Sequence, residues 1–251
     1  MSQETDPATD RPARKQQQRS LVTQQKLLHA AVEAFSENGF KGTSTRDIAE
    51  RAGVHHPLIT YHFKNKEQLW QAAAEKIFGD FRRSLAASLD DNADECPKTR
   101  MASLIRAYVY YARSQPALHR VLVQEASVPN PRLDWLIETH LKPFFEATFD
   151  MIEELQKLGV APAGNARLLF NMIRLSSGGL LALGNELKES SGIEIVSTDT
   201  LDEFAEMIAN VFLPGEVRSR TCLGQGAGRP AYRYSICIAM WQAASAVISP
   251  T

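Results

Sequence analysis

Hydrophobic positions recur every three or four residues along most of the chain from Leu21 to Leu213, which is the pattern of amphipathic α-helices. No segment alternates between apolar and polar residues over the length of a strand. The pattern therefore predicts an all-α fold. Residues 1–19 are polar, without aromatic side chains, and we expect them to form a disordered basic arm.

Three short helices are predicted within residues 20–66. The first ends at Asn38-Gly39, where a glycine accommodates a positive φ. Thr43 or Ser44 can cap the second, and a turn at Ala52-Gly53-Val54 leads to the third, from about His56 to His62. The expected core consists of Phe35, Phe40, Ile48, Val54, Ile59 and Phe63.

A long helix is predicted to open at Asn65, with Gln68 completing a capping box, and to lead into a larger helical domain over residues 67–213. Pro143 should kink or break one helix of that domain. The expected helices cover about 98–114, 117–126, 132–158, 164–187 and 199–213. Residues 214–251 form an atypical tail, either a disordered extension or an extra packed helix.

The net charge of −1 gives no general attraction to nucleic acid, but residues 11–70 hold ten lysines and arginines against five acidic residues. The three cysteines (Cys96, Cys222 and Cys237) lack CxxC spacing, so we expect neither a disulfide framework nor a metal site. The N-terminus is polar and no run of 18 apolar residues occurs, so we expect a cytoplasmic protein without a membrane partner.

The second and third predicted helices, joined by a tight turn, form a helix-turn-helix, whose second helix enters the DNA major groove. That helix begins with imidazoles and a proline, which can contact base edges and a thymine methyl. Hydroxyls and cations nearby can hold phosphates. The candidate DNA-binding residues are Thr45, Arg46, His55, His56, Pro57, Thr60, Tyr61, His62 and Lys66. The alternative interpretation is a solvated surface.

Residues 24–71 resemble the DNA-binding domain of TetR-family regulators. The matching motifs are Phe35, Gly39 and Phe40; Thr45, Ile48, Ala49, Ala52, Gly53 and Val54; Tyr61, His62 and Phe63; and Lys66 with Glu67. The resemblance implies phosphate contacts from Thr45 and Lys66, backbone contacts from Tyr61 and His62, and groove contacts from His55, His56 and Pro57. Two positions depart from the family pattern: Thr60 replaces a frequent tyrosine, and His55 a small capping residue.

For the second domain, the resemblance implies a ligand cavity and a dimer interface built from the last two helices, about 164–187 and 199–213. Arg174 could pair with a ligand carboxylate or with an internal glutamate. The candidate ligand-binding residues are Phe81, Tyr108, Tyr111, His119, Trp135, His140, Phe144, Phe145, Met172 and Arg174. The alternative interpretation of each is ordinary core or surface.

The sequence thus predicts a homodimeric repressor that a small-molecule effector releases from a palindromic operator in double-stranded DNA. The alternative is an activator or architectural DNA-binding protein without an effector. No HExxH, GxSxG or phosphate-binding loop motif occurs, so we expect neither an enzyme nor a cofactor.

Overall fold

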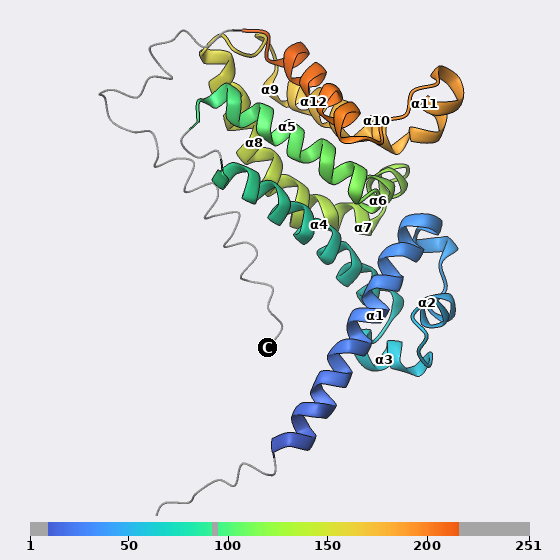
Figure 1. Cartoon of the computed structure of the whole chain (residues 1–251). Helices are drawn as coiled ribbons and strands as arrows, with labels where there is room; N and C mark the ends of the chain where they lie inside the picture. The colour runs from blue at the N-terminus through green and yellow to red at the C-terminus, as the bar shows by residue number, and fades with distance from the viewer. Residues whose placement is uncertain (1–9, 92–94, 216–251) are drawn as a thin grey trace, which may run out of the picture. The chain divides into compact units, whose positions relative to one another are not determined.

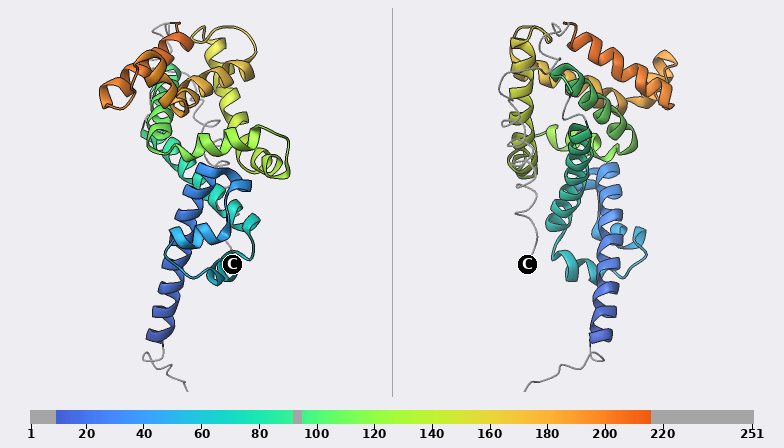
Figure 2. Two further views of the ribbon diagram at one scale, coloured as in Figure 1. Left: turned by 90° about the vertical axis from the view of Figure 1, so that its right-hand side faces the viewer. Right: turned by 60° about the vertical axis from the view of Figure 1, so that its left-hand side comes forward.

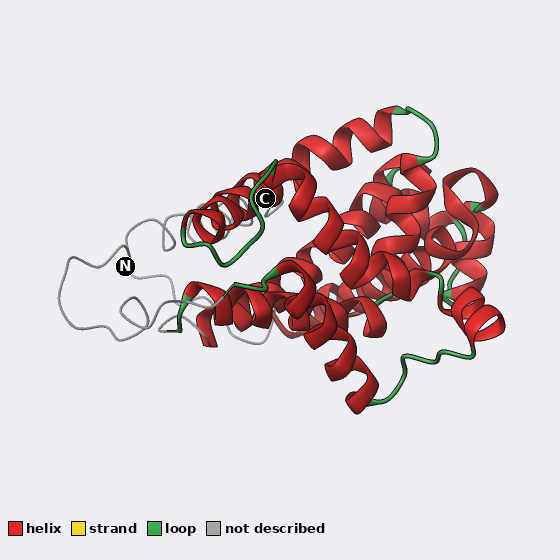
Figure 3. Cartoon of the chain, turned by 90° about the horizontal axis from the view of Figure 1, so that it is seen from above, coloured by secondary structure: helices red, strands yellow, loops and turns green. Residues whose placement is uncertain are grey.

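The computed structural model of the chain describes residues 10–91 and 95–215. Every regular element in these ranges is a helix (Figure 3), which confirms the all-α fold. The chain divides into two compact units after Ile77. None of the helices in the described ranges is long and apolar enough to cross a membrane. The predicted tail lies outside the described residues from position 216 onward.

The first unit contains α1 (Asp10–Gly42), α2 (Thr45–Arg51), α3 (Pro57–Phe63) and the start of α4 (Lys66–Asp91) (Figure 1). Because α1 begins at Asp10, residues 10–19 are helical, contrary to the expected disordered arm. These residues include arginines, a lysine and three glutamines, which favour helix. Pro12 falls in the first turn, where its missing N–H costs no hydrogen bond.

A kink at Gly39 ends the regular part of α1, as the sequence predicted. Gly39 has a φ of 68°, which a residue with a side chain rarely adopts. The hydroxyl of Thr43 lies 3.0 Å from the carbonyl oxygen of Ala34 and 2.8 Å from that of Gly39. The buried Thr43 hydroxyl thereby ties the chain after the kink to the last turns of the helix before it.

The division between the two units falls inside α4, whereas we expected it between residues 66 and 67, where the long helix starts. The first turns of α4 contribute Leu69 and Trp70 to the core of the first unit, both at most 2% exposed. The Trp70 ring also makes an edge contact with Phe40, at 6.5 Å between centroids. Burial of these side chains assigns the first part of α4 to the first unit.

The second unit holds the rest of α4 and the helices that follow it (Figures 1 and 2). These are α5 (Pro97–Ser114), α6 (Ala117–Ala126), α7 (Pro131–Leu136), α8 (Lys142–Lys157), α9 (Ala166–Arg174), α10 (Leu180–Ala182), α11 (Gly184–Ser191) and α12 (Thr198–Phe212). α12 lies along α5, where Asp202 accepts a hydrogen bond from the Tyr110 hydroxyl at 2.7 Å and pairs with Arg106 at 2.8 Å.

In the described ranges, two π-helical turns interrupt the helices predicted over about 132–158 and 164–187. The first, η1 (Ile137–Leu141), joins α7 to α8 directly before Pro143, the predicted site of a kink. Proline supplies no N–H to the preceding turn, which explains the break. The second, η2 (Leu175–Gly179), joins α9 to α10 and contains two serines and two glycines, which are weak helix formers.

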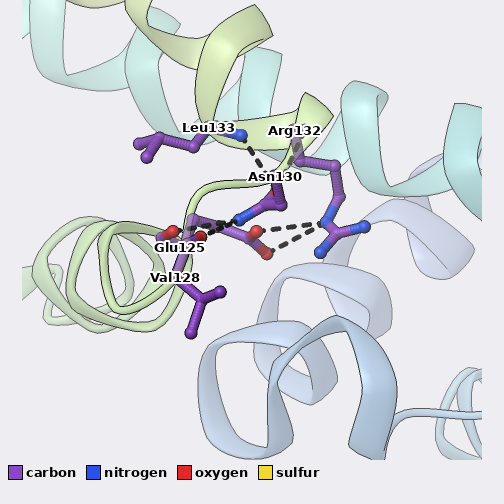
Figure 4. A network of polar contacts seen from close by, with 5 residues as sticks. All are labelled: Glu125, Val128, Asn130, Arg132 and Leu133. Atoms are coloured by element: carbon purple, nitrogen blue, oxygen red, sulfur yellow. Dashed lines mark hydrogen bonds and ion pairs between the residues drawn. The ribbon is translucent and has the colours of Figure 1, made fainter.

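A buried ion pair holds the loop between α6 and α7 (Figure 4). The Nε of Arg132 donates to both carboxylate oxygens of Glu125, at 3.1 and 3.2 Å, and the Glu125 side chain is only 5% exposed. The side-chain oxygen of Asn130 caps α7 by accepting from the amides of Arg132 and Leu133, while its NH₂ donates to the carbonyls of Glu125 and Val128. The polar groups of the loop are thereby satisfied internally.

Candidate functional site

The start of α2 is fixed by a reciprocal cap. The Ser44 hydroxyl accepts from the Asp47 amide at 3.1 Å, and the Ser44 amide donates to the Asp47 carboxylate at 3.2 Å. Hydrogen bonds from the side chain and the backbone of Ser44 to the Asp47 carboxylate lower the pKa of Asp47. Because the cap sets the first turn of α2, it orients Thr45 and Arg46, which follow it directly.

The turn between α2 and α3 is set by Gly53, whose φ is 63°. The amide of Gly53 donates to the carbonyl of Glu50, and the amide of Val54 donates to the carbonyl of Ala49, both at 3.0 Å. This pair of hydrogen bonds is the Schellman motif, which ends a helix and redirects the chain. The predicted helix-turn-helix is therefore present as a local structure.

The helix-turn-helix presents its polar side chains on a surface opposite its core. Ile48, Ala49, Ile59 and Phe63 are buried. Of the predicted DNA-binding residues, the exposed ones are Arg46, His55, His56, Pro57, Thr60 and Tyr61, and the half-buried ones are Thr45, His62 and Lys66. All nine predicted residues are thus at least partly accessible within the first unit.

Thr45 and His56 connect the starts of α2 and α3. The Thr45 hydroxyl lies 3.0 Å from Nε2 of His56, the residue that precedes α3. Either group can donate, because the direction depends on which imidazole nitrogen carries the proton. The contact links a predicted phosphate-binding residue with a predicted groove residue.

Aromatic contacts orient three further polar side chains. The Lys66 ammonium lies 4.4 Å from the centroid of the Phe40 ring, a cation–π contact at the start of α4. Tyr61, 75% exposed, has its ring 4.9 Å from that of His62 in an edge-on arrangement. Partial burial lowers the pKa of His62.

One feature of this surface was missed by sequence reasoning. Lys64, the residue after α3, is exposed and has a φ of 61°, in the region that favours glycine. Its conformation makes the turn into α4 sharp, with the amide of Asn65 2.6 Å from the carbonyl of Phe63. A lysine carries no sequence signal for such a backbone, so only the structure identifies the positive φ at this exposed cation.

The second unit contains an apolar cavity of about 40 Å³. Three of the predicted ligand-binding residues, Tyr108, Phe144 and Arg174, line it. The other lining residues come from α4, α5, α8, α9 and η2 and were not predicted to bind a ligand: Leu85, Met101, Leu104, Ile105, Thr148, Ile152, Phe170, Ile173 and Ser177. The cavity has only three polar or charged side chains besides the Tyr108 phenol: Thr148, Arg174 and Ser177.

Four more predicted ligand-binding residues lie behind or beside this lining. The Phe81 ring is 5.3 to 5.4 Å from those of Tyr108, Tyr111 and Phe144, and the Phe145 ring is 6.1 Å from that of Phe144. Nε2 of His119 lies 2.8 Å from the Tyr108 hydroxyl oxygen in a buried contact. These side chains support the cavity without lining it.

The remaining three predicted ligand-binding residues lie elsewhere. His140, in η1, stacks on Phe78 with ring centroids 4.8 Å apart, contacts Trp135, and accepts a hydrogen bond from Arg82 at 2.9 Å. Met172 is 55% exposed, because it lies on the face of α9 that points away from the cavity. These positions differ from the expectation that all three line one pocket.

An apolar groove of about 690 Å³ crosses the surface of the second unit between α12 and the η2–α10 segment. Its lining residues are Val123, Leu175, Ser176, Gly179, Leu180, Ala182, Leu183, Phe204, Met207, Ile208, Val211 and Phe212. Leu175, Met207 and Val211 are 55 to 65% exposed. Exposed apolar surface of this extent is typical of protein–protein interfaces.

No group of three or more His, Cys, Asp or Glu side chains in the described ranges is arranged to hold a metal ion.

The sequence of the first unit matches a known family. Residues 27–73 fit the profile of bacterial regulatory proteins of the tetR family. The Escherichia coli K12 transcriptional regulator RutR is 26% identical over 190 residues, which cover 75% of this chain and 88% of RutR. A probable regulator of Bacillus subtilis, YttP, is 24% identical over 121 residues, 48% of this chain, which span only 58% of YttP.

A solved structure extends the likeness to the fold of both units. The crystal structure of the Bacillus subtilis transcriptional regulator FadR, in complex with stearoyl-CoA, superposes with a TM-score of 0.59. The match covers 76% of this chain and 98% of that structure at 21% sequence identity. The common feature at this identity is the helical architecture.

Proposed function

The chain is a DNA-binding helix-turn-helix regulator of the TetR family, and on that premise we propose that it acts as a homodimeric repressor, released from a palindromic operator by a small-molecule effector. The family is one of transcription regulators rather than enzymes. The observation that carries the proposal is the pairing of an accessible polar surface on the helix-turn-helix with an exposed apolar groove in the second unit.

For DNA, we assign the first turn of α3 to the major groove. His55, His56 and Pro57 are exposed there, where imidazole N–H groups can donate to base acceptors and the proline ring can contact a thymine methyl. Thr45, Lys66, Tyr61, His62, Arg46 and Thr60 are assigned to the phosphate backbone. The backbone contacts fix register, and the groove contacts select sequence.

A salt titration tests the phosphate assignment. Lys66→Ala should weaken binding to every duplex and reduce the slope of log affinity against log salt by about one unit, because one fewer counterion is released. Lys157→Ala, which removes an exposed lysine of the second unit, should leave the slope unchanged. An unaltered slope in Lys66→Ala would remove Lys66 from the interface.

The proposed dimer forms through the apolar groove between α12 and the η2–α10 segment. Two copies of this surface can bury each other's exposed leucine, methionine and valine side chains. Removal of this apolar area from water provides a favourable free energy of association for a self-complementary interface. Dimeric regulators place two recognition helices about 34 Å apart, on successive major grooves of a palindrome.

Two valines of equal exposure test the interface. Val211, 65% exposed, lies in the groove, and Val128, 66% exposed, lies outside it. Val211→Asp should shift the chain from dimer to monomer in analytical ultracentrifugation, because a buried carboxylate without a partner is costly. Val128→Asp should stay dimeric. A wild-type monomer at micromolar concentration, or a dimeric Val211→Asp, contradicts the proposed interface.

The effector is proposed to bind in the apolar cavity of the second unit, as pockets for small molecules are mostly apolar with few polar groups. FadR, which has a similar fold, holds stearoyl-CoA in its crystal structure. Release from DNA needs an effector that binds more tightly to the conformation with low DNA affinity. To shift the ratio of that conformation to the DNA-binding one from 1:99 to 99:1, the difference in binding free energy must be roughly 5.5 kcal/mol. Because α4 contributes residues to both units, it is the covalent connection through which such a preference can act.

Selection of bound sequences from random DNA, with and without a metabolite library, tests the whole proposal. We expect an inverted repeat without metabolites and loss of enrichment with the effector. An asymmetric site, or enrichment that no metabolite alters, favours the alternative, an activator or architectural protein without an effector. The regulator is expected to act in the cytoplasm, where chromosomal DNA is accessible.

A further inference from the structure

We propose that the effector is a monocarboxylate with an apolar body, whose carboxylate binds between Arg174 and Tyr108. This inference rests on the proposed effector site and names its ligand chemistry. It concerns residues of the second unit alone, which α5, α6, α9 and η2 bring together.

The body of the ligand follows from the lining. Most of the cavity wall consists of aliphatic and phenyl groups, such as Leu104, Ile152 and Phe170. Transfer of an apolar group from water into such a site is favourable in free energy. A polar group there would lose its hydrogen bonds to water and find no replacement. The body of the occupant is therefore a hydrocarbon chain or ring.

The head of the ligand follows from Arg174. Arg174 lines this apolar cavity. The described neighbours of its guanidinium are the side-chain oxygen of Asn171, at 3.1 and 3.3 Å, the Tyr108 hydroxyl, with which it forms a hydrogen bond, and the ring of Phe145. No carboxylate of the described residues pairs with it. A half-buried guanidinium with only neutral neighbours is a binding site for an anion, and a planar carboxylate matches its fork of donors.

Tyr108 and His119 supply a second donor at the same end. The His119 side chain is 5% exposed, and burial together with the nearby Arg174 charge lowers its pKa to about 4, so it is neutral at pH 7. Its Nδ1 is buried without a hydrogen-bond partner. Of the two neutral tautomers of His119, the one with its proton on Nε2 costs less free energy. In that tautomer Nε2–H donates to the Tyr108 hydroxyl and only an acceptor, Nδ1, is left unpaired, and a buried N–H without a partner is rarer than a buried acceptor without one.

In that tautomer the Tyr108 hydroxyl proton is not used by His119 and can be donated into the cavity, which Tyr108 lines. Arg174 lies close enough to Tyr108 to lower its pKa against the raising effect of burial. One carboxylate can therefore accept from both side chains. Gly178 permits this arrangement, because a Cβ at that position would lie 2.1 Å from His119 Nε2.

The size of the ligand is limited by the space. The cavity of about 40 Å³ is far smaller than the roughly 300–1,000 Å³ of sites for drug-sized molecules. An occupant must displace flexible lining side chains such as Met101 and Leu85, which selects ligands of modest size. We therefore choose two carboxylates as probes: octanoate, whose apolar body is a hydrocarbon chain, and 4-phenylbutanoate, whose apolar body contains a ring. Octan-1-ol is the uncharged control of the same chain length as octanoate.

Isothermal titration of the full chain without DNA tests the ligand class. At least one carboxylate should bind about tenfold or more tightly than octan-1-ol, as expected for a hydrogen-bonded charge. Arg174→Gln should lose that advantage while keeping its affinity for octan-1-ol. Arg113→Gln, which changes an exposed arginine at the end of α5, should bind like wild type, and Tyr108→Phe should lose part of the affinity.

Equal affinity for octan-1-ol and both carboxylates, binding of neither carboxylate, or unchanged carboxylate affinity in a folded Arg174→Gln overturns the inference. If circular dichroism shows that Arg174→Gln does not fold, the inference is still tested by the preference of the wild type for a carboxylate over octan-1-ol and by the carboxylate affinity of Tyr108→Phe. Operator release is measured separately by fluorescence anisotropy. A carboxylate that binds through Arg174 without releasing DNA supports the ligand class and refutes effector-driven release.

Discussion

The Thr45 hydroxyl lies 3.0 Å from Nε2 of His56, so the first residue of α2 contacts the residue that directly precedes α3. The two side chains differ in proposed role, since Thr45 is assigned to phosphate and His56 to bases. The contact restrains the imidazole before DNA is bound. Such restraint lowers the conformational entropy that a free side chain would lose on binding.

His56→Ala should change which bases the regulator selects. The loss of one base contact removes roughly 1–3 kcal/mol of discrimination at that position, or about five- to 150-fold. The measurement is sequencing of duplexes selected by the wild type and the variant. Lys66→Ala provides the contrast, because loss of a phosphate contact should weaken all duplexes alike and leave the selected sequence intact. An identical selected sequence for His56→Ala would exclude it from base recognition.

Features set by a few neighbouring residues could be predicted from the sequence. The cap at Ser44, the positive φ of Gly39 and Gly53 and the break near Pro143 all appear at their predicted positions. Each depends on one residue whose chemistry leaves few backbone choices. The early start of α1 was missed, because the polar composition of residues 10–19 fits both a disordered arm and an exposed helix.

The composition of the cavity could not be predicted in the same way. Its lining comes from α4, α5, α8, α9 and η2, and a helix contributes only the residues of one face. Arg174 and Met172 lie two positions apart, yet one lines the cavity and the other is exposed. Without the packing of the helices, residue type alone could not separate them. The π-helical turn η1 likewise shifts the register of the residues around His140.

Gly178→Ala should destabilise the second unit. The new Cβ would lie 2.1 Å from Nε2 and 2.3 Å from Cε1 of His119, and 3.1 Å from Cζ of Tyr108. His119 cannot move away easily, because it is buried and in contact with the Tyr108 hydroxyl. We expect a loss of about 1–3 kcal/mol in unfolding free energy from overpacking, measured by urea denaturation.

Gly184→Ala is the control for this substitution. Gly184 is the first residue of α11 and does not line the groove, and a Cβ at this position would meet no neighbouring side chain within 4 Å. Alanine also favours helix over glycine, so stability should stay equal or rise. Equal stability of the two variants would show that His119 yields to the added methyl group.

Glu125→Ala should destabilise the chain through the loop between α6 and α7. The substitution removes the Glu125 carboxylate from the Arg132 guanidinium, whose side chain is 16% exposed. Removal of one partner of a buried ion pair costs about 3–5 kcal/mol. Glu194→Ala breaks the exposed pair with Lys188, which water screens, and should leave the urea midpoint nearly unchanged. Similar midpoints for both variants would mean that Arg132 is rehydrated when Glu125 is removed.

His119 should make the folded chain less stable in mild acid. Burial, with a contribution from Arg174, lowers the pKa of His119 from its ordinary value of 6.5 to about 4. Between these values the unfolded chain binds a proton that the folded chain does not, so the contribution is complete above pH 6.5 and is lost as the pH falls toward 4. The loss is about 1.4 kcal/mol per pH unit, and His119→Gln should flatten the dependence of unfolding free energy on pH by that amount. A His119→Gln slope equal to that of wild type in this range would mean that the imidazole takes up its proton in the folded chain.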